Sequence, residues 1–221
     1  MAKVISEIGT DSNNRPPSII GICEIENRGV VEDLISHENL SNYNYSFVHY
    51  DSPDKRGIDV ALIYNTDIFE VINSKSHELY ITYNNTSERS YTRDQLVVSG
   101  KLDGELLHLI VNHWPSRGAD ETKRIAAAKV NKSIIDSLRE IYKNPKIITM
   151  GDFNDDPFDK SIKQVIGTKK YIKDVRKDDM YNPFEKILVD DGIGTNAYRD
   201  KWQLFDQIIL SKPFLKKDYK D

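Results

Sequence analysis

The chain has 221 residues, which is enough for one domain with a substantial apolar core. Hydrophobic residues make up 38% and charged residues 30%, as in ordinary globular proteins, and 12 tyrosines argue against disorder over most of the length. The net charge of −4 excludes a protein that basic charge alone holds on nucleic acid. It does not exclude a hydrolase in which a bound metal ion supplies the positive charge locally.

Several other classes of protein are excluded or left open. Cys23 is the one cysteine, so neither a disulfide framework nor a cysteine-based zinc site can form. No apolar run approaches the length of about 18 residues that a membrane span needs. No signal peptide stands at Met1, so the localisation is unknown; a secreted or periplasmic protein would have lost its N-terminal signal. The first nine residues predict an amphipathic helix with Val4, Ile5 and Ile8 inward.

Short apolar runs alternate with helical patterns along the rest of the chain. Helices are predicted over residues 28–34 and 120–142, the second with an apolar inner side and an Asn144-Pro145 stop. Strands are predicted over residues 18–23, 45–49, 58–64, 69–80, 95–102, 106–111, 146–150 and 205–210. Asp103-Gly104 is typical of a hairpin turn between two of them. Hairpins together with separate helices predict one α/β (α+β) domain over residues 1–221, with two packed sheets and helices outside.

Polar residues gather where three of the apolar runs stop. Glu24 and Glu26 follow the first run, His113 ends another, and Asp152 and Asn154 lie in Gly-Asp-Phe-Asn of residues 151–154. Strand ends are where α/β folds place functional groups on a rigid base. Carboxylates can bind Mg²⁺, and a histidine can handle protons near neutral pH. This inventory fits the hydrolysis of a phosphoester.

Each of these residues also has a structural interpretation. Glu24 and Glu26 could form the acidic first turn of a helix, which the helix dipole stabilises. Asp152 could open an acidic helix cap, and His113 could be a satisfied, partly buried histidine. The occurrence of all of them in one order along the chain favours the functional interpretation.

That order resembles the endonuclease/exonuclease/phosphatase superfamily of DNase I-like proteins, and within it the bacterial secreted-nuclease-like members. The residues that carry the resemblance are the Gly-Asp-Phe-Asn segment, the strand that ends in Glu24, the Asn-His-Trp-Pro-Ser-Arg segment of residues 112–117 and the strand of residues 205–210. The resemblance implies that Glu24 binds the metal and that Asp152, Asn154 and His113 are catalytic. Asp206 would support a further catalytic histidine.

The resemblance also implies a fold, a cofactor and substrates. The fold would be a DNase I-like four-layer sandwich of two mixed sheets, and the cofactor Mg²⁺ or its substitutes Mn²⁺ and Ca²⁺. The function would be that of a divalent-metal-dependent phosphodiesterase, foremost a nuclease acting on DNA or RNA. Arg93, Arg117 and Asp59 would be further substrate contacts, although surface or core-edge arginines are the more frequent case.

Two departures from the family pattern affect these expectations. Family members begin with a strand that carries a metal-binding Asn, which would precede Met1, and end with a Ser-Asp-His segment, whereas no histidine follows His113. We therefore expect a chain truncated at both ends, without edge strands, that binds metal weakly and hydrolyses poorly. Alternatives are a phosphatase or phospholipase on small phosphoesters or lipids, and a non-catalytic binding module. The choice between endonuclease and exonuclease and the oligomeric state leave no trace in the sequence.

Overall fold

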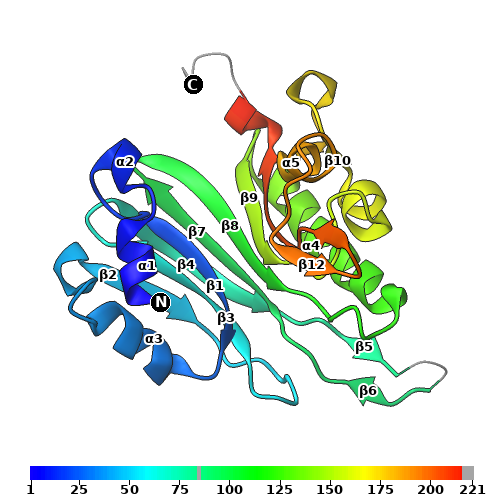
Figure 1. Cartoon of the computed structure of the whole chain (residues 1–221), viewed down its shortest axis with the longest axis horizontal. Helices are drawn as coiled ribbons and strands as arrows, with labels where there is room; N and C mark the ends of the chain where they lie inside the picture. Colours follow the sequence, from blue (N-terminus) through cyan, green and yellow to red (C-terminus); the bar gives the residue numbers. More distant parts are fainter. Residues whose placement is uncertain (84–85, 216–221) are drawn as a thin grey trace.

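Two β-sheets pack face to face in the computed structural model, which describes residues 1–83 and 86–215 (Figure 1). The larger sheet has the strand order β10-β11-β14-β9-β8-β7-β4. Its strands span Phe69–His77 (β4), Gln95–Leu102 (β7), Glu105–His113 (β8), Lys146–Asp152 (β9), Thr168–Lys169 (β10), Met180–Tyr181 (β11) and Asp206–Ser211 (β14). β8 and β9 run parallel, as do β10 and β11, and the other neighbours are antiparallel.

The smaller sheet is antiparallel and has the order β1-β3-β2. Its strands span Ile19–Ile25 (β1), Tyr45–His49 (β2) and Asp59–Asn65 (β3). Two short hairpins stand apart from both sheets, with the bounds Ile81–Thr82 (β5) and Arg89–Ser90 (β6), and Asn196–Tyr198 (β12) and Lys201–Gln203 (β13).

The helices cover the outer faces of the two sheets. They span Ala2–Glu7 (α1), Thr10–Asn13 (α2), Arg28–Ser36 (α3), Glu121–Ile141 (α4) and Phe184–Val189 (α5). Shorter turns span Ser41–Tyr43 (η1), Ser161–Ile166 (η2, a π-helix), Ile172–Asp174 (η3) and Lys212–Leu215 (η4). Over residues 1–83 and 86–215, no helix combines the length and the apolar character that a membrane crossing requires.

Three apolar clusters fill the spaces between these layers. Leu62, Leu109 and Met150 belong to the cluster between the two sheets. Val31 of α3 lies in the cluster on the outer side of the smaller sheet, and Ile135 of α4 lies in the one behind the larger sheet. Helix, sheet, sheet and helix therefore follow one another, which confirms the predicted DNase I-like sandwich of mixed α/β class.

Several local predictions hold and a few are wrong. Asp103 and Gly104 both have positive φ angles, 48° and 83°, as the predicted hairpin turn requires. Val4 and Ile8 are exposed, whereas α1 buries Ile5 together with Ala2, so the predicted inner side is right for Ile5 and wrong for Val4 and Ile8. A helix of only six residues presents one short stripe, and that stripe packs against Leu40 and its neighbours. β4 also ends at His77 and does not continue to residue 80.

The parallel pairing of β8 and β9 depends on a glycine. Gly151 has a φ of 124°, and a Cβ atom there would lie 2.1 Å from the carbonyl oxygen of Asn112 on β8. Any side chain at residue 151 would push the two strands apart. The Asn112 side chain is fully buried beside this contact, where its amide donates to Thr149 Oγ1 and Met150 O, and its Oδ1 accepts from Trp114 Nε1.

We predict that Gly151→Ala lowers the free energy of unfolding by about 3 kcal/mol or more, because strain and steric overlap add. Gly167→Ala is the matched control, since Gly167 also has a positive φ, 84°, but no atom lies within 4 Å of its added Cβ. That control should lose only about 1–2 kcal/mol. Urea unfolding of both variants measures the difference, and equal losses would refute the proposed contact with Asn112.

Candidate active site

Three neighbouring strands bring predicted site residues to one edge of the larger sheet. β9 lies between β8 and β14, and its last residue, Asp152, pairs with His113 on one side and with Asp206 on the other. All three residues stand in adjacent register positions, although 93 residues separate the first from the last. The strand order alone therefore places an imidazole and two carboxylates side by side.

Asn154 folds back onto Asp152 in a tight turn. Its φ of 51° lies in the left-handed region, which asparagine tolerates better than most residues. The backbone N–H of Asn154 donates to Asp152 Oδ1 at 2.8 Å, and its Nδ2 lies 3.2 Å from Asp152 Oδ2. The same Nδ2 donates to Trp114 O at 3.0 Å, so the turn fixes the carboxylate between two loops.

Glu24 reaches this edge from the smaller sheet because β1 contains a bulge. Glu24 has a φ of 60°, and the register of β1 against β3 shifts between Cys23 and Ile25. Period-two alternation would put Glu24 on the face of Ile22, away from the larger sheet. The bulge absorbs one residue, so Ile25 packs on that outer face instead, and the Glu24 carboxylate lies near enough to Asp152 to raise its pKa.

Burial makes Asp152 and Asp206 at this edge weaker acids. Burial raises the pKa of Asp152 to about 6, and the charges of Asp206 and Glu24 add to the effect. Burial also raises the pKa of Asp206. The Cys23 thiol beside them is buried, its pKa is raised to about 12, and its Sγ donates to Asn112 O at 3.2 Å. Cys23 is therefore a packing residue and no nucleophile.

His113 is held in its neutral form at physiological pH. Its side chain is 4% exposed, and burial lowers its pKa to about 3, with the positive charges of Arg93 and Arg56 contributing. Its Nε2 lies 3.5 Å from Asp152 Oδ2, whereas its buried Nδ1 has no hydrogen-bond partner among residues 1–83 and 86–215. A neutral imidazole can still donate one hydrogen bond to a phosphate oxygen or to Asp152.

Arg93 lies beneath this edge as a buried clamp. Its Nε and NH2 donate to the carbonyl oxygens of His113 and Trp114, at 3.2 and 2.6 Å. Its NH1 pairs with Asp54 Oδ2 at 3.1 Å, and Asp54 Oδ1 accepts from the backbone N–H of Arg56 at 2.9 Å. The sequence analysis did not identify Asp54 and Arg56 as neighbours of the site. The sequence of the loop over residues 50–58 contains no pattern that predicts an ion pair with Arg93.

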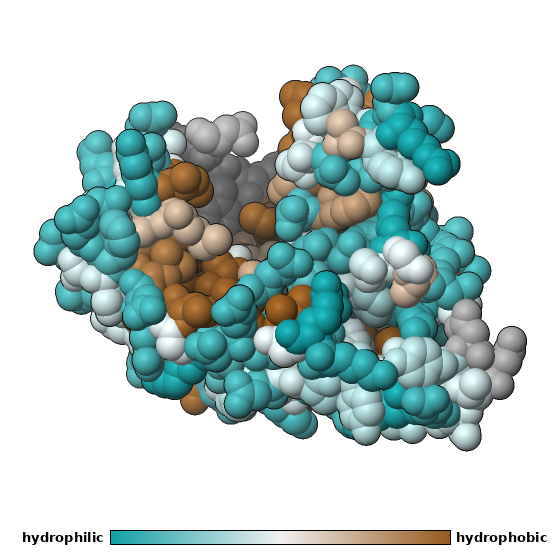
Figure 2. Space-filling view, turned by 60° about the horizontal axis from the view of Figure 1, so that its bottom comes forward, coloured by the Kyte–Doolittle hydropathy of each residue, from teal (hydrophilic) through white to brown (hydrophobic). Residues whose placement is uncertain are grey.

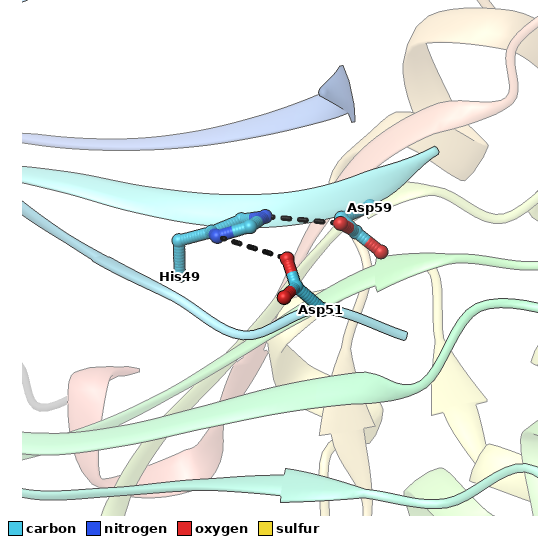
Figure 3. A group of neighbouring side chains, drawn as sticks. All are labelled: His49, Asp51 and Asp59. Atoms are coloured by element: carbon cyan, nitrogen blue, oxygen red, sulfur yellow. Dashed lines mark hydrogen bonds and ion pairs between the residues drawn. The ribbon is translucent and has the colours of Figure 1, made fainter. Parts of the chain in front are cut away.

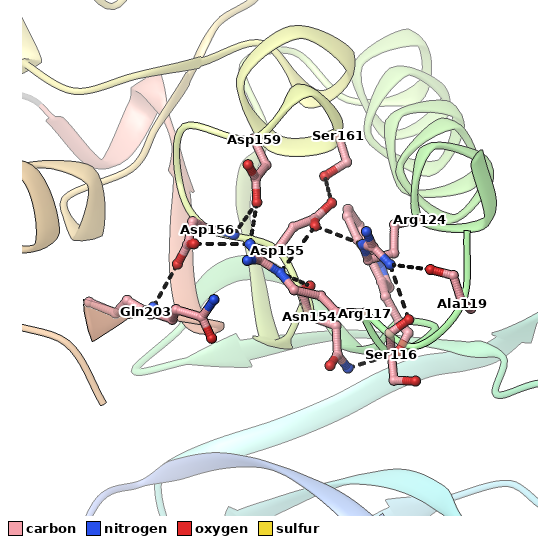
Figure 4. A network of polar contacts seen from close by, with 12 residues as sticks. Ser116, Arg117, Ala119, Arg124, Asn154, Asp155, Asp156, Asp159, Ser161 and Gln203 are labelled. Carbon is pink, nitrogen blue, oxygen red and sulfur yellow. Dashed lines mark hydrogen bonds and ion pairs between the residues drawn. The ribbon is translucent and has the colours of Figure 1, made fainter. Parts of the chain in front are cut away.

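Arg117 and Arg124 hold the acidic loop that follows Asn154 (Figure 4). Arg124 Nε donates to Asp155 Oδ1 at 2.7 Å, and Arg117 NH2 pairs with Asp156 at 2.9 Å and with Asp159. The Arg117 guanidinium also lies over the Phe205 ring, 4.5 Å from its centroid. The charges of three aspartates in this loop are therefore compensated by two arginines.

Asp59 pairs with Ile25, which packs on the outer side of the smaller sheet, and Figure 3 shows it beside His49 and Asp51. It accepts from Ser52 N and Oγ at 2.8 and 2.6 Å, and its Oδ2 lies 3.0 Å from His49 Nε2. His49, Asp51 and Asp59 form a group that could hold a metal ion, since their ligand atoms all lie within 4.8 Å of one another. The hydrogen bonds of Asp59 already fasten the loop of residues 50–58, so this group also has a structural role.

The Glu24–Asp152 edge also offers the donor chemistry of a divalent-cation site. A hard cation such as Mg²⁺ commonly takes one or two carboxylates and completes its shell with water and substrate oxygens. Asp152, 26% exposed, carries a pKa raised by burial and by two other carboxylates, and a nearby cation would relieve that repulsion. The donor atoms present are therefore those that such an ion prefers.

A family model described as the Endonuclease/Exonuclease/phosphatase family matches residues 1–221. The chain belongs to this family. No curated protein sequence matches it. Members of the family are hydrolases that act on phosphoester bonds, and they depend in general on divalent metals.

Solved structures show the same fold at low sequence identity. The human Nocturnin catalytic domain with bound sulfate is 18% identical, with 96% of this chain and 74% of that chain covered and a TM-score of 0.60. Truncated TDP2 from Caenorhabditis elegans is 15% identical, with coverages of 96% and 76% and a TM-score of 0.65. A mannosyl-6-phosphatase from Bacteroides thetaiotaomicron is 18% identical, with coverages of 95% and 76% and a TM-score of 0.64.

We predict that Asp152→Asn stabilises this family member in alkaline but not in acidic solution. The folded-state pKa of Asp152, about 6, exceeds the unfolded value of 3.8, so the native state holds its proton more tightly. Stability is therefore lost as the pH rises from about 4 to about 6, and asparagine avoids that loss. We expect a gain of about 2 kcal/mol at about pH 8 in EDTA, after solvent screening of the partly exposed group. Thermal unfolding at both pH values measures it, and an equal effect at about pH 4 would contradict the assigned pKa.

Proposed function

We propose that the protein is a divalent-metal-dependent phosphodiesterase that cleaves nucleic acid. The observation that carries this proposal is the meeting of His113, Asp152 and Asp206 on adjacent strands with Glu24 from the opposing sheet. Four segments that are distant in sequence supply these groups. Such convergence of weakened acids and a neutral histidine at a strand end is typical of an active site.

The metal ion would be held by Glu24 together with Asp152, and it would supply the positive charge that a phosphodiester needs in its transition state. Asp152 would orient the attacking water, since the Asn154 turn fixes both of its oxygens. Asp206, next to Asp152 in the sheet, would add negative charge that strengthens the binding of a cation.

His113 and Asn154 would contact the phosphate. The imidazole of His113 is neutral near pH 7 and remains so in acid, because its pKa is about 3. It would therefore act as a hydrogen-bond donor to a phosphoryl oxygen, and a role as a cationic acid does not fit. Arg93 would position His113 by donating to the carbonyl oxygen of His113. The Arg93 guanidinium already donates to three protein acceptors, so it is not a substrate contact in this proposal. Arg117, 33% exposed over Phe205, is the more accessible arginine for a substrate phosphate.

A phosphatase acting on small phosphoesters is the second candidate, because one similar structure is a mannosyl-6-phosphatase. The two candidates differ in substrate and share the same catalytic edge. Plasmid DNA and single-stranded oligonucleotides, compared with sugar and inositol phosphates, separate them. A non-catalytic binding module would turn over none of these substrates with any divalent metal.

We predict that Asp152→Ala and His113→Ala each lower metal-stimulated cleavage of nucleic acid by at least about 100-fold. Each variant should keep its free energy of unfolding within about 1–2 kcal/mol of the parent, so the loss is chemical and not structural. Arg176→Ala, a change in an exposed arginine of the turn that precedes β11, is the activity control. Unchanged turnover in Asp152→Ala would refute the assigned edge.

We predict further that Glu24→Gln weakens Mn²⁺ binding at least about tenfold, because one anionic ligand becomes neutral. Asp51→Asn is the matched control in the His49 group and should leave the affinity unchanged. Electron paramagnetic resonance of free Mn²⁺ measures both affinities without any turnover. The reverse result, with affinity lost only in Asp51→Asn, would move the metal to the group in Figure 3.

A further inference from the structure

The β5–β6 hairpin carries two exposed tyrosines on one face and projects away from both sheets (Figure 1). Tyr80 is 59% exposed and Tyr91 is 45% exposed. The guanidinium of Arg89 lies between them, 5.2 Å from the Tyr80 ring centroid and 4.6 Å from that of Tyr91. Tyr80, Arg89 and Tyr91 are called the aromatic arm below. It presents flat π-faces to solvent, with a delocalised cation between them.

A third tyrosine, Tyr83, connects the opposite face of the hairpin to the rest of the molecule. Lys55 donates to the Tyr83 hydroxyl at 2.6 Å, and Lys123 of α4 lies 5.0 Å from the centre of the same ring. Lys123 also donates to Ser90 Oγ at 3.2 Å. These contacts hold the arm from its inner side, where a cavity of about 600 Å³ is lined by Tyr80, Tyr83 and Lys123 among others.

The arm begins at the rim of the candidate active site. Tyr91 lies two residues before Arg93, so their Cα atoms are at most about 7 Å apart. Arg93 in turn donates to the carbonyl oxygens of His113 and Trp114. Lys55, which donates to Tyr83 of the hairpin, follows Asp54, the partner of Arg93, and precedes the exposed cation Arg56. A polymer bound at the site would therefore pass directly from these cations onto the arm.

We propose that the aromatic arm is a binding platform for single-stranded nucleic acid, with bases stacked on Tyr80 and Tyr91. The inference deepens the proposed nuclease function and rests on it for the identity of the substrate. Bases of any kind present a π-face, so exposed rings bind a single strand without reading its sequence. Bases inside a duplex are already stacked on one another and do not offer these faces.

Charge around the arm favours stacking over phosphate contacts as the source of affinity. Glu78 pairs with Arg89, and the whole chain carries a net charge of −4. A protein that bound a duplex through its phosphates would need an uncompensated basic surface, which the arm lacks. The face of the molecule in Figure 2 is mostly teal and pale, with its main brown apolar area at the left.

Binding to short fluorescent oligonucleotides in EDTA tests the proposal without cleavage, with the full chain and the double variant Tyr80→Ala/Tyr91→Ala. We expect the double variant to bind single-stranded DNA or RNA at least about tenfold more weakly, and anisotropy measures the change. Separate measurements with DNA and with RNA show which polymer the aromatic arm binds more tightly. Duplex binding should stay the same, and so should the metal-stimulated hydrolysis of bis(4-nitrophenyl) phosphate, which is too small to reach the arm.

Tyr171→Ala is the matched control, because Tyr171 is also exposed and has Lys170 and Lys173 over its ring, but it follows the edge strand β10. Unchanged single-strand affinity in the double variant, or an equal loss in the Tyr171 control, would overturn the proposal. An equal loss of duplex affinity would overturn its restriction to single strands. If the proposed nuclease function were wrong, no nucleic acid would be hydrolysed, even though single strands could still bind to the aromatic arm. The two proposals can therefore fail separately.

Discussion

The close approach of β8 and β9 at Asn112 and Gly151 is the constraint on which the candidate active-site edge depends. The two backbones meet where a Cβ atom at residue 151 would lie 2.1 Å from the Asn112 carbonyl oxygen. One residue further along, the same register sets His113 beside Asp152. Below them, the buried side-chain amides of Asn112 and Asn131 both donate hydrogen bonds to Thr149 Oγ1, which ties β8 and α4 to β9. A polar group left without a partner there would lower the stability of the fold. The packing of Asn112 against Gly151 therefore sets the relative positions of His113 and Asp152, the next residues along the two strands.

Concentrating acids at that edge has a cost in stability. Asp152 is desolvated and faces two further carboxylates, which raises its pKa to about 6. Sites of this kind trade stability for function, and a ligand of opposite charge recovers the loss when it binds. By contrast, the aspartates at 155 and 156 have arginine partners and are satisfied without any ligand. Asp152 thus differs from the neighbouring Asp155 and Asp156, whose charges arginines compensate.

The layered fold and the strand ends that carry the site residues could be predicted from the apolar patterns of the sequence. The local irregularities of the strands could not. Apolar runs placed Asp152, His113 and Asp206 at strand ends, and the structure brings them together. The bulge at Glu24 was invisible, because a strand pattern does not show which residue will take a positive φ. Asp59 lies on the far face for the related reason that period-two alternation, unbroken in β3, turns it toward His49. The roles of these residues stay predictions.

Arg93 shows why residue type alone could not separate a substrate contact from a supporting residue. The sequence offered Arg93 as a possible phosphate contact, yet its side chain is only 5% exposed and its N–H groups already donate to three protein acceptors. The acceptors themselves explain its position. They include the carbonyls of His113 and Trp114 and the carboxylate of Asp54, which belong to two loops and meet only in the fold. Because a desolvated guanidinium needs such partners, the arginine ties the loop of residues 50–58 to the catalytic strand. Any movement of that loop must then act on His113 through one rigid, planar group.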